Sequence, residues 1–123
     1  MNLVEAEFSE IGGFQKMSEV LQRGDLPSGV ICATDVMHIG ALSAIKEKGL
    51  RVPNQISLVS FGDIPLAGML ETPLTTVKIP YIEIGQVAFE ILLSLIKGEN
   101  LQAKDIIFPV KLIVRQTTQA VNE

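Results

Sequence analysis

The sequence is poor in histidine and cysteine, which serve in many enzyme active sites, and it lacks the paired cysteines that stabilise many secreted proteins through disulfides. Its 123 residues include one cysteine, one histidine, one tyrosine and no tryptophan. A single cysteine excludes an internal disulfide and is compatible with a reducing compartment. The first residues lack the basic and apolar runs of a signal peptide, and no apolar run reaches the length of a membrane span. We therefore expect a soluble, cytoplasmic protein with an aliphatic core.

Clustered positive charge and catalytic motifs are missing as well. The net charge is −4, and no cluster of lysine and arginine exceeds two residues. Direct binding to nucleic acid needs a positive stripe, so we do not expect it of this chain. We find no glycine-rich phosphate loop, no GxSxG and no metal-ligand spacing. His38 stands alone in a helical pattern, Cys32 lies among apolar neighbours, and the aspartates are scattered. We therefore predict no catalysis, no cofactor and no metal.

The sequence does contain a regular alternation of helical and strand patterns. The expected helices lie between Ser9 and Gly24, between Asp35 and Gly49, and over 81–97, with Ser9 and Asp35 as candidate N-caps. Apolar runs at 30–34 and 56–61 predict strands covered on both faces. Shorter pieces are the end of a strand at 2–6, one or two helical turns at 65–70, and extended segments at 75–77 and 106–115. Short connections between these elements predict an α/β fold with a parallel βαβ sheet and flanking helices.

Two of the predicted strands end in polar loops. Thr34-Asp35 follows the first strand, and Phe61-Gly62-Asp63 follows the second. Ligands of open parallel sheets bind beyond the carboxyl ends of the strands, so both loops are candidate binding sites. Asp35 can cap the next helix, contact a ligand, or do both. Asp63 can contact a ligand or act as an Asx-turn residue that orients its loop.

Five stretches, in this order and spacing, resemble the C-terminal part of LacI/GalR-type bacterial transcription regulators. They are EFSEIGGFQKM (7–17), GVICATDVMHIGALSAIKEKGLRVPNQISLVSFGD (29–63), TPLTTVKIP (72–80), IGQVAFEILLSLIKGE (84–99) and IIFPVKLIVRQTT (106–118). The resemblance implies part of a type I core like that of periplasmic binding proteins. Residues 1–77 would form the C-terminal lobe, 78–109 a crossing segment with one helix of the N-terminal lobe, and 110–123 the return strand and tail.

The resemblance also implies a site for a small effector, usually a sugar or a purine, between the two lobes. Phe8 matches a ring that stacks on the ligand, although it can instead form a hydrophobic staple before Ser9. Thr34 and Asp35 match a polar pair that faces the ligand. Gly62 stands where the family carries its usual ligand-binding aspartate, and Asp63 matches a second, more structural acid. Ile79 stands where the family commonly has glutamine, so this side of the implied ligand site is less polar. The identity of the effector is therefore left open.

A further implication is dimerisation. Ile39, Leu42, Met69 and Leu70 match positions of the family's dimer contact, with packing in the core as the alternative. We therefore expect the effector-binding and dimerisation part of a regulator whose DNA-binding headpiece lies outside this chain. The rival interpretations are a solute-binding protein of a sugar transporter and a fragment of an α/β enzyme. Without its partner lobe, the helix 81–97 should dock on the chain itself or on a second copy.

Overall fold

The structure is a computed structural model that describes residues 3–99 and 105–120. Its elements are α1 (Glu10–Gln22), β1 (Gly29–Ile31), α2 (Asp35–Glu47), β2 (Ser57–Gly62), the 3-10 turn η1 (Pro65–Gly68), β3 (Thr76–Lys78), α3 (Tyr81–Ile96) and β4 (Lys111–Ile113). The chain divides into two compact units, which we describe separately. The first unit comprises residues up to 78 together with those from 112 onward, and the second comprises 79–111.

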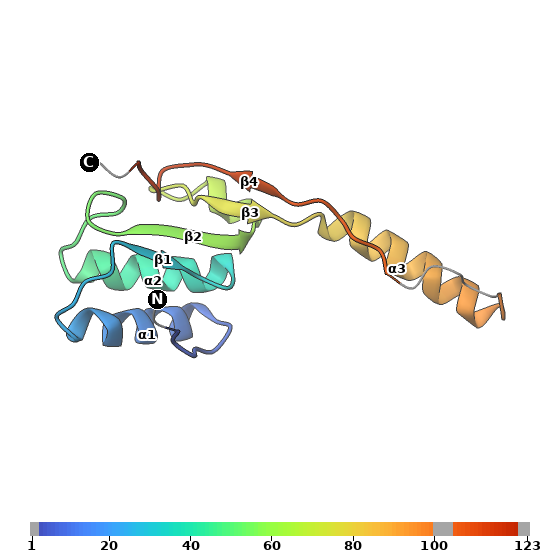
Figure 1. The fold of residues 1–123 in the computed structure, drawn as a ribbon, viewed down its shortest axis with the longest axis horizontal. Helices are drawn as coiled ribbons and strands as arrows, with labels where there is room; N and C mark the ends of the chain where they lie inside the picture. Colours follow the sequence, from blue (N-terminus) through green and yellow to red (C-terminus); the bar gives the residue numbers. More distant parts are fainter. Residues whose placement is uncertain (1–2, 100–104, 121–123) are drawn as a thin grey trace. The chain divides into compact units, whose positions relative to one another are not determined.

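The strands form a sheet in the order β1-β2-β3-β4 (Figure 1). β1 pairs in parallel with β2, and β2 in parallel with β3. Val30 lies opposite Leu58 in the first pair, and Phe61 lies opposite Val77 in the second. The predicted α/β class with a parallel βαβ sheet is thereby confirmed.

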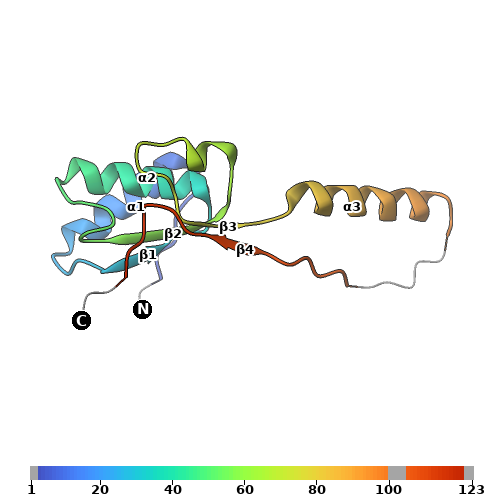
Figure 2. The same ribbon diagram turned by 90° about the horizontal axis from the view of Figure 1, so that it is seen from above.

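Helices α1 and α2 pack side by side on one side of this sheet, and α2 lies against β2 (Figures 1 and 2). Glycines allow the two helices to approach closely. A Cβ atom on Gly40 would lie 1.9 Å from the main-chain oxygen of Glu10, and one on Gly13 would lie 2.2 Å from that of Met37. The core beneath the sheet is aliphatic, as predicted, and comprises Met17, Leu21, Cys32, Ala41, Leu42, Ala44, Ile45, Ile56, Leu58, Ala67 and Leu74.

The N-cap of α1 is the one predicted from the sequence, whereas the N-cap of α2 is not. Ser9 caps α1, because its side chain accepts a hydrogen bond from the Gly12 amide. The predicted cap of α2 was wrong: Thr34 is the N-cap and accepts from the Met37 amide, while Asp35 is the first helical residue. Both residue types cap well, so local sequence does not decide between them. The Asp35 side chain instead accepts hydrogen bonds from residues of other elements.

The strands differ from the prediction in extent and in cover. β1 is shorter than the run 30–34, and β2 is shifted by one residue from 56–61. The part of 2–6 that the structure describes contains no strand; residue 2 lies outside the described range. Cover on both faces was wrong for β1, because successive strand residues face opposite sides and Ile31 is 73% exposed. Helices α1 and α2, which follow one another in sequence around β1, occupy the same side.

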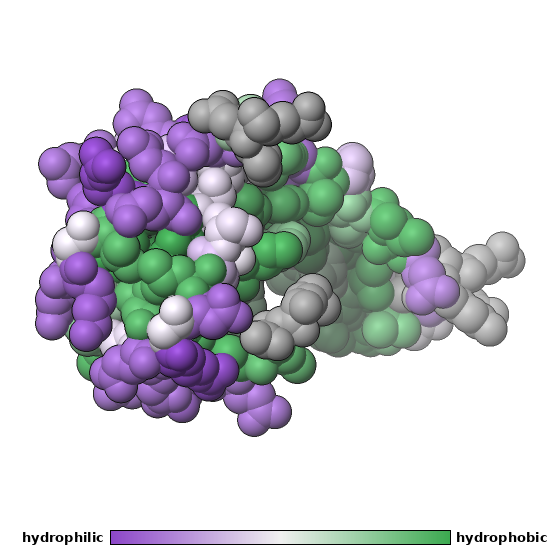
Figure 3. Space-filling view, turned by 60° about the vertical axis from the view of Figure 1, so that its left-hand side comes forward, coloured by the Kyte–Doolittle hydropathy of each residue, from purple (hydrophilic) through white to green (hydrophobic). Residues whose placement is uncertain are grey.

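The second unit consists mainly of α3, which no side chain caps at its N-terminus. Its polar side chains, Glu83, Gln86, Glu90 and Ser94, recur at helical spacing and form one narrow stripe. Most of its other residues are apolar, the side of the helix visible in Figure 3 is largely hydrophobic, and none of its residues is buried. A helix that is apolar around most of its circumference is typical of a buried position. Its expected docking on the chain or on a second copy stays a prediction.

Candidate functional site

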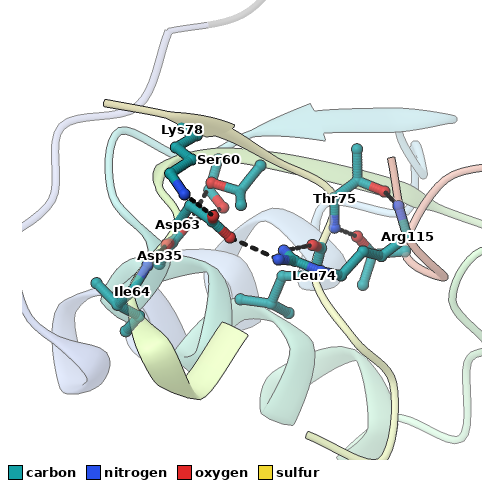
Figure 4. A network of polar contacts seen from close by, with 10 residues as sticks. Asp35, Ser60, Asp63, Ile64, Leu74, Thr75, Lys78 and Arg115 are labelled. Atoms are coloured by element: carbon teal, nitrogen blue, oxygen red, sulfur yellow. Dashed lines mark hydrogen bonds and ion pairs between the residues drawn. The ribbon is translucent and has the colours of Figure 1, made fainter. Parts of the chain in front are cut away.

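The candidate site lies at the carboxyl end of β2, where a buried carboxylate joins three elements of the first unit (Figure 4). Asp35, at the start of α2, accepts hydrogen bonds at Oδ1 from Ser60 Oγ of β2 and Thr76 Oγ1 of β3, both at 2.6 Å. Its Oδ2 accepts the backbone N–H of Ile64 at 2.9 Å. The three contacts place α2, the end of the sheet and the following loop in one fixed arrangement.

These contacts also set the charge of Asp35. Burial alone would raise the pKa of this carboxyl, because it disfavours the charged form. Hydrogen bonds from Ser60, Thr76 and the backbone of Ile64 favour the carboxylate and bring its pKa below the ordinary value. The carboxylate also lies at the N-terminus of α2, where the helix dipole favours negative charge. Asp35 is therefore ionised at neutral pH, although its side chain is buried.

His38, on the next turn of α2, extends this network inward. Its Nδ1 lies 2.9 Å from Ser60 Oγ. The single hydroxyl proton of Ser60 goes to Asp35, so Ser60 accepts from His38, and we assign the proton of the neutral ring to Nδ1. Burial lowers the pKa of His38 to about 4, although the charge of Asp35 acts in the opposite direction. His38 is thus a neutral, buried packing residue that orients Ser60.

The loop above Asp35 needs glycine at position 62. Gly62 has a φ of +140°, which side-chain-bearing residues rarely adopt, and a Cβ there would lie 3.0 Å from Asp35 Oδ2. The next residue, Asp63, also has a positive φ, of 58°. An aspartate at position 62 would therefore be strained in this loop conformation, which is consistent with the glycine found there. At position 62 the loop therefore presents main-chain groups and no carboxylate.

Asp63 is held by two cations. Its Oδ1 accepts a hydrogen bond from Arg115 Nη2 at 2.6 Å, and its Oδ2 lies 4.0 Å from Lys78 Nζ. The Asp63 side chain is only 12% exposed. Arg115 also donates through Nη1 to the carbonyl oxygen of Leu74 at 2.8 Å. The sequence interpretation placed Asp63 in the loop but missed both partners, which lie 15 and 52 residues away in the chain.

The remaining predicted ligand residues differ in exposure. Phe8 is 75% exposed, and the residue that would complete a hydrophobic staple with it at the fourth helical position is Gly13. Because Gly13 has no side chain, the staple alternative for Phe8 was wrong. Thr34 is half-buried and uses a lone pair of its hydroxyl to cap α2. Its hydroxyl proton has no protein acceptor among the hydrogen bonds of the described residues.

The predicted dimer contacts are divided between core and surface. Leu42 belongs to the core, and Ile39 and Leu70 pack against it while staying partly accessible. Met69 is 78% exposed. Leu42 is therefore a packing residue in this chain, as the alternative interpretation had it, because α2 turns this face toward the sheet. Met69 is the member of the set that offers the most surface.

One hollow of the first unit is lined by none of the predicted ligand residues. This cavity of about 660 Å³ lies between α1, β1 with the two residues that follow it, and the α2 residues Met37 and Ala41, and parts of residues 3–6 complete its lining. Within residues 3–99 and 105–120, no group of three His, Cys, Asp or Glu side chains could hold a metal ion. In the same part of the chain, no helix combines the length and apolar character needed to cross a membrane.

Comparison with known proteins identifies the family. A model described as "Periplasmic binding protein-like domain" matches residues 3–118. The transcriptional repressor MelR of Bacillus subtilis is 40% identical over 111 residues, covering 90% of this chain and 32% of that protein. The structure of the lac repressor dimer bound to operator and an anti-inducer has a TM-score of 0.86 and 36% identity, covering 94% of this chain and 40% of that one.

A further structure, a LacI family transcriptional regulator from Enterococcus faecium with bound ribose, has a TM-score of 0.85 and 27% identity. The match covers 94% of this chain and 42% of that one. The chain spans about a third of the length of the curated relatives it matches. It therefore belongs to the periplasmic binding protein-like domain family, in the form found in the effector-binding region of LacI/GalR-type transcriptional regulators.

Proposed function

We propose that this chain is the effector-binding and dimerisation part of a cytoplasmic LacI-type transcriptional regulator, and that its effector is a small, sugar-like molecule. The observation that carries the proposal is the loop Gly62–Ile64, fixed by the buried Asp35 at the carboxyl end of a parallel strand. The ribose bound by the relative from Enterococcus faecium supports the choice of a sugar. Contact with DNA would belong to a headpiece outside this chain.

The individual residues support different roles in such a site. Phe8 presents an exposed ring that can stack on the C–H face of a sugar. Thr34 has a hydroxyl proton to donate to a ligand oxygen while its lone pair caps α2. Asp35 has both carboxylate oxygens engaged, so we assign it the role of holding the loop rather than touching the effector. Gly62 would contribute its main chain, and Asp63 the edge of the loop.

Binding of this kind acts by shifting an equilibrium and requires no catalysis. An effector favours one arrangement of the lobes in the complete protein only by its difference in affinity for the available arrangements. A dimer would pass that preference to the DNA-binding segments, with Met69 and the accessible parts of Ile39 and Leu70 as its contacts. The solute-binding protein of a transporter would use a similar site. DNA binding by the complete protein, measured by mobility shift, distinguishes the two.

The test is calorimetry on the complete protein against a panel of sugars that begins with D-ribose. Replacement of the ring in Phe8→Ala should weaken binding of the recognised sugar about tenfold, which is about 1.4 kcal/mol. Ile11→Ala, which shortens another exposed apolar side chain nearby, is the matched control and should leave the affinity unchanged. Equal affinities of Phe8→Ala and the wild type would remove Phe8 from the site. Failure of every sugar to bind would refute the proposed effector class.

A further inference from the structure

We propose that the Asp63 carboxylate acts as a clasp between the two chain segments that lead to the second unit. It contacts each segment close to the point where that segment joins the first unit. The inference deepens the proposed function, because it names the group that couples the candidate ligand loop to those segments. Lys78 is the last residue of the first unit before the chain leaves it. Arg115 follows three residues after the chain returns at Leu112. Asp63 contacts both cations (Figure 4).

The two contacts of the clasp differ in strength. Arg115 is fixed by three groups: Asp63 Oδ1 at 2.6 Å, the Leu74 carbonyl at 2.8 Å, and Thr75 Oγ1, which accepts the Arg115 backbone N–H at 2.9 Å. A short, partly buried hydrogen bond between charged groups is strong and resists screening by salt. Lys78 is farther away, at 4.0 Å, and its side chain is 60% exposed. The clasp therefore holds the returning segment firmly and the outgoing segment loosely.

The other end of the clasp is the candidate ligand loop. Asp63 lies between Gly62, which rests on Asp35, and Ile64, whose N–H donates to the same carboxylate. The positive φ of Asp63 sets the direction of its Cα–Cβ bond, and Arg115 and Lys78 hold the carboxylate beyond it. A displacement of the loop therefore moves the carboxylate that Arg115 and Lys78 share. Through that side chain a change at the loop reaches Arg115 in the returning segment, whereas the outgoing segment is also connected to the loop by the strand pairing of Gly62 with Lys78.

The test is amide hydrogen exchange, followed by mass spectrometry, on the complete protein without ligand. Asp63→Asn keeps the shape of the side chain but removes its charge. It should accelerate exchange at least fivefold in 112–117, where the Arg115 and Gln116 amides are hydrogen bonded, and less in 76–79. Lys78→Met should affect only 76–79. Glu71→Gln, which neutralises an exposed acid paired with Lys46, is the matched control and should leave both segments unchanged.

The coupling itself is tested by a double variant. Gly62→Ala disturbs the loop from within and should also accelerate exchange in 112–117. In the Asp63→Asn background it should add little there, because the connection has already been removed. Unchanged exchange in 112–117 on Asp63→Asn, or an equal acceleration throughout α1 and α2, would overturn the clasp. No ligand is present in this experiment, so a failure to bind sugars would refute the proposed function and leave this result standing.

Discussion

Replacement of Ser60 by alanine should strongly destabilise the first unit. The Ser60 hydroxyl donates to Asp35 Oδ1 at 2.6 Å and accepts from His38 Nδ1 at 2.9 Å. Its loss removes a hydrogen bond to a charged group, worth about 1.5–3 kcal/mol, and leaves a buried N–H without an acceptor, which costs about 1–3 kcal/mol more. We expect a loss of about 3–4 kcal/mol in the free energy of unfolding, out of a total of about 5–15 kcal/mol for a typical domain.

The measurement is urea denaturation followed by circular dichroism, with Ser43→Ala as the control. The Ser43 hydroxyl donates to the Ile39 carbonyl on the exposed side of α2, so its removal should change stability by less than about 0.5 kcal/mol. The double variant His38→Leu with Ser60→Ala also removes the imidazole N–H that Ser60→Ala leaves without an acceptor. It should therefore be less destabilised than the sum of the single variants, by about 1–2 kcal/mol. A loss in Ser60→Ala no larger than that of the control would refute the network.

Two other predictions concern the same site. Between pH 6.5 and about 4 the unfolded chain binds a proton at His38 that the folded chain does not, so stability should fall by up to about 3 kcal/mol as the pH drops through this window. His38→Gln should flatten that part of the urea-midpoint profile, and an unchanged slope would contradict the assignment. Gly62→Ala should cost about 1–2 kcal/mol more than Gly24→Ala in thermal unfolding, because both glycines have positive φ but only a Cβ at Gly62 meets the Asp35 carboxylate. Equal losses would show that the contact with Asp35 is unimportant.

The helices and the sheet class could be predicted because their signals are local. Ser9 marks the start of α1 with a side chain that caps it, and Gly24 and Gly49 follow the ends of α1 and α2 with positive φ. The apolar stripes between these residues are the faces that meet the core. The prediction of cover on both faces of β1 failed for a related reason. An apolar strand indicates which side chains avoid water, but not which part of a protein covers them.

The partners within the site could not be predicted, because they come from distant parts of the chain. Asp35 and Ser60 are 25 residues apart, and Asp63 and Arg115 are 52 apart. Thr34 and Asp35 can both cap a helix, and the aspartate is the better cap, so only the polar groups on β2 and β3 explain why Asp35 turns inward instead. One signal was present: Ser60 interrupts an apolar strand, and His38 lies on the core side of α2. Two polar residues on facing apolar surfaces are a reason to expect a buried hydrogen bond.

The two aspartates of the site have different roles, because Asp35 is buried beneath the loop and Asp63 contacts residues beyond it. Asp35 is shielded from solvent and accepts hydrogen bonds from β2, β3 and the Ile64 amide, so its loss would remove the anchor of the loop that follows β2. Asp63 contacts Arg115 and Lys78, so its loss would leave the loop in place and remove its side-chain contact with the returning segment, while Gly62 stays paired with Lys78. The order of the loop and its contact with Arg115 therefore depend on different carboxylates. Variants at Asp35 should change stability first, and variants at Asp63 should change coupling first.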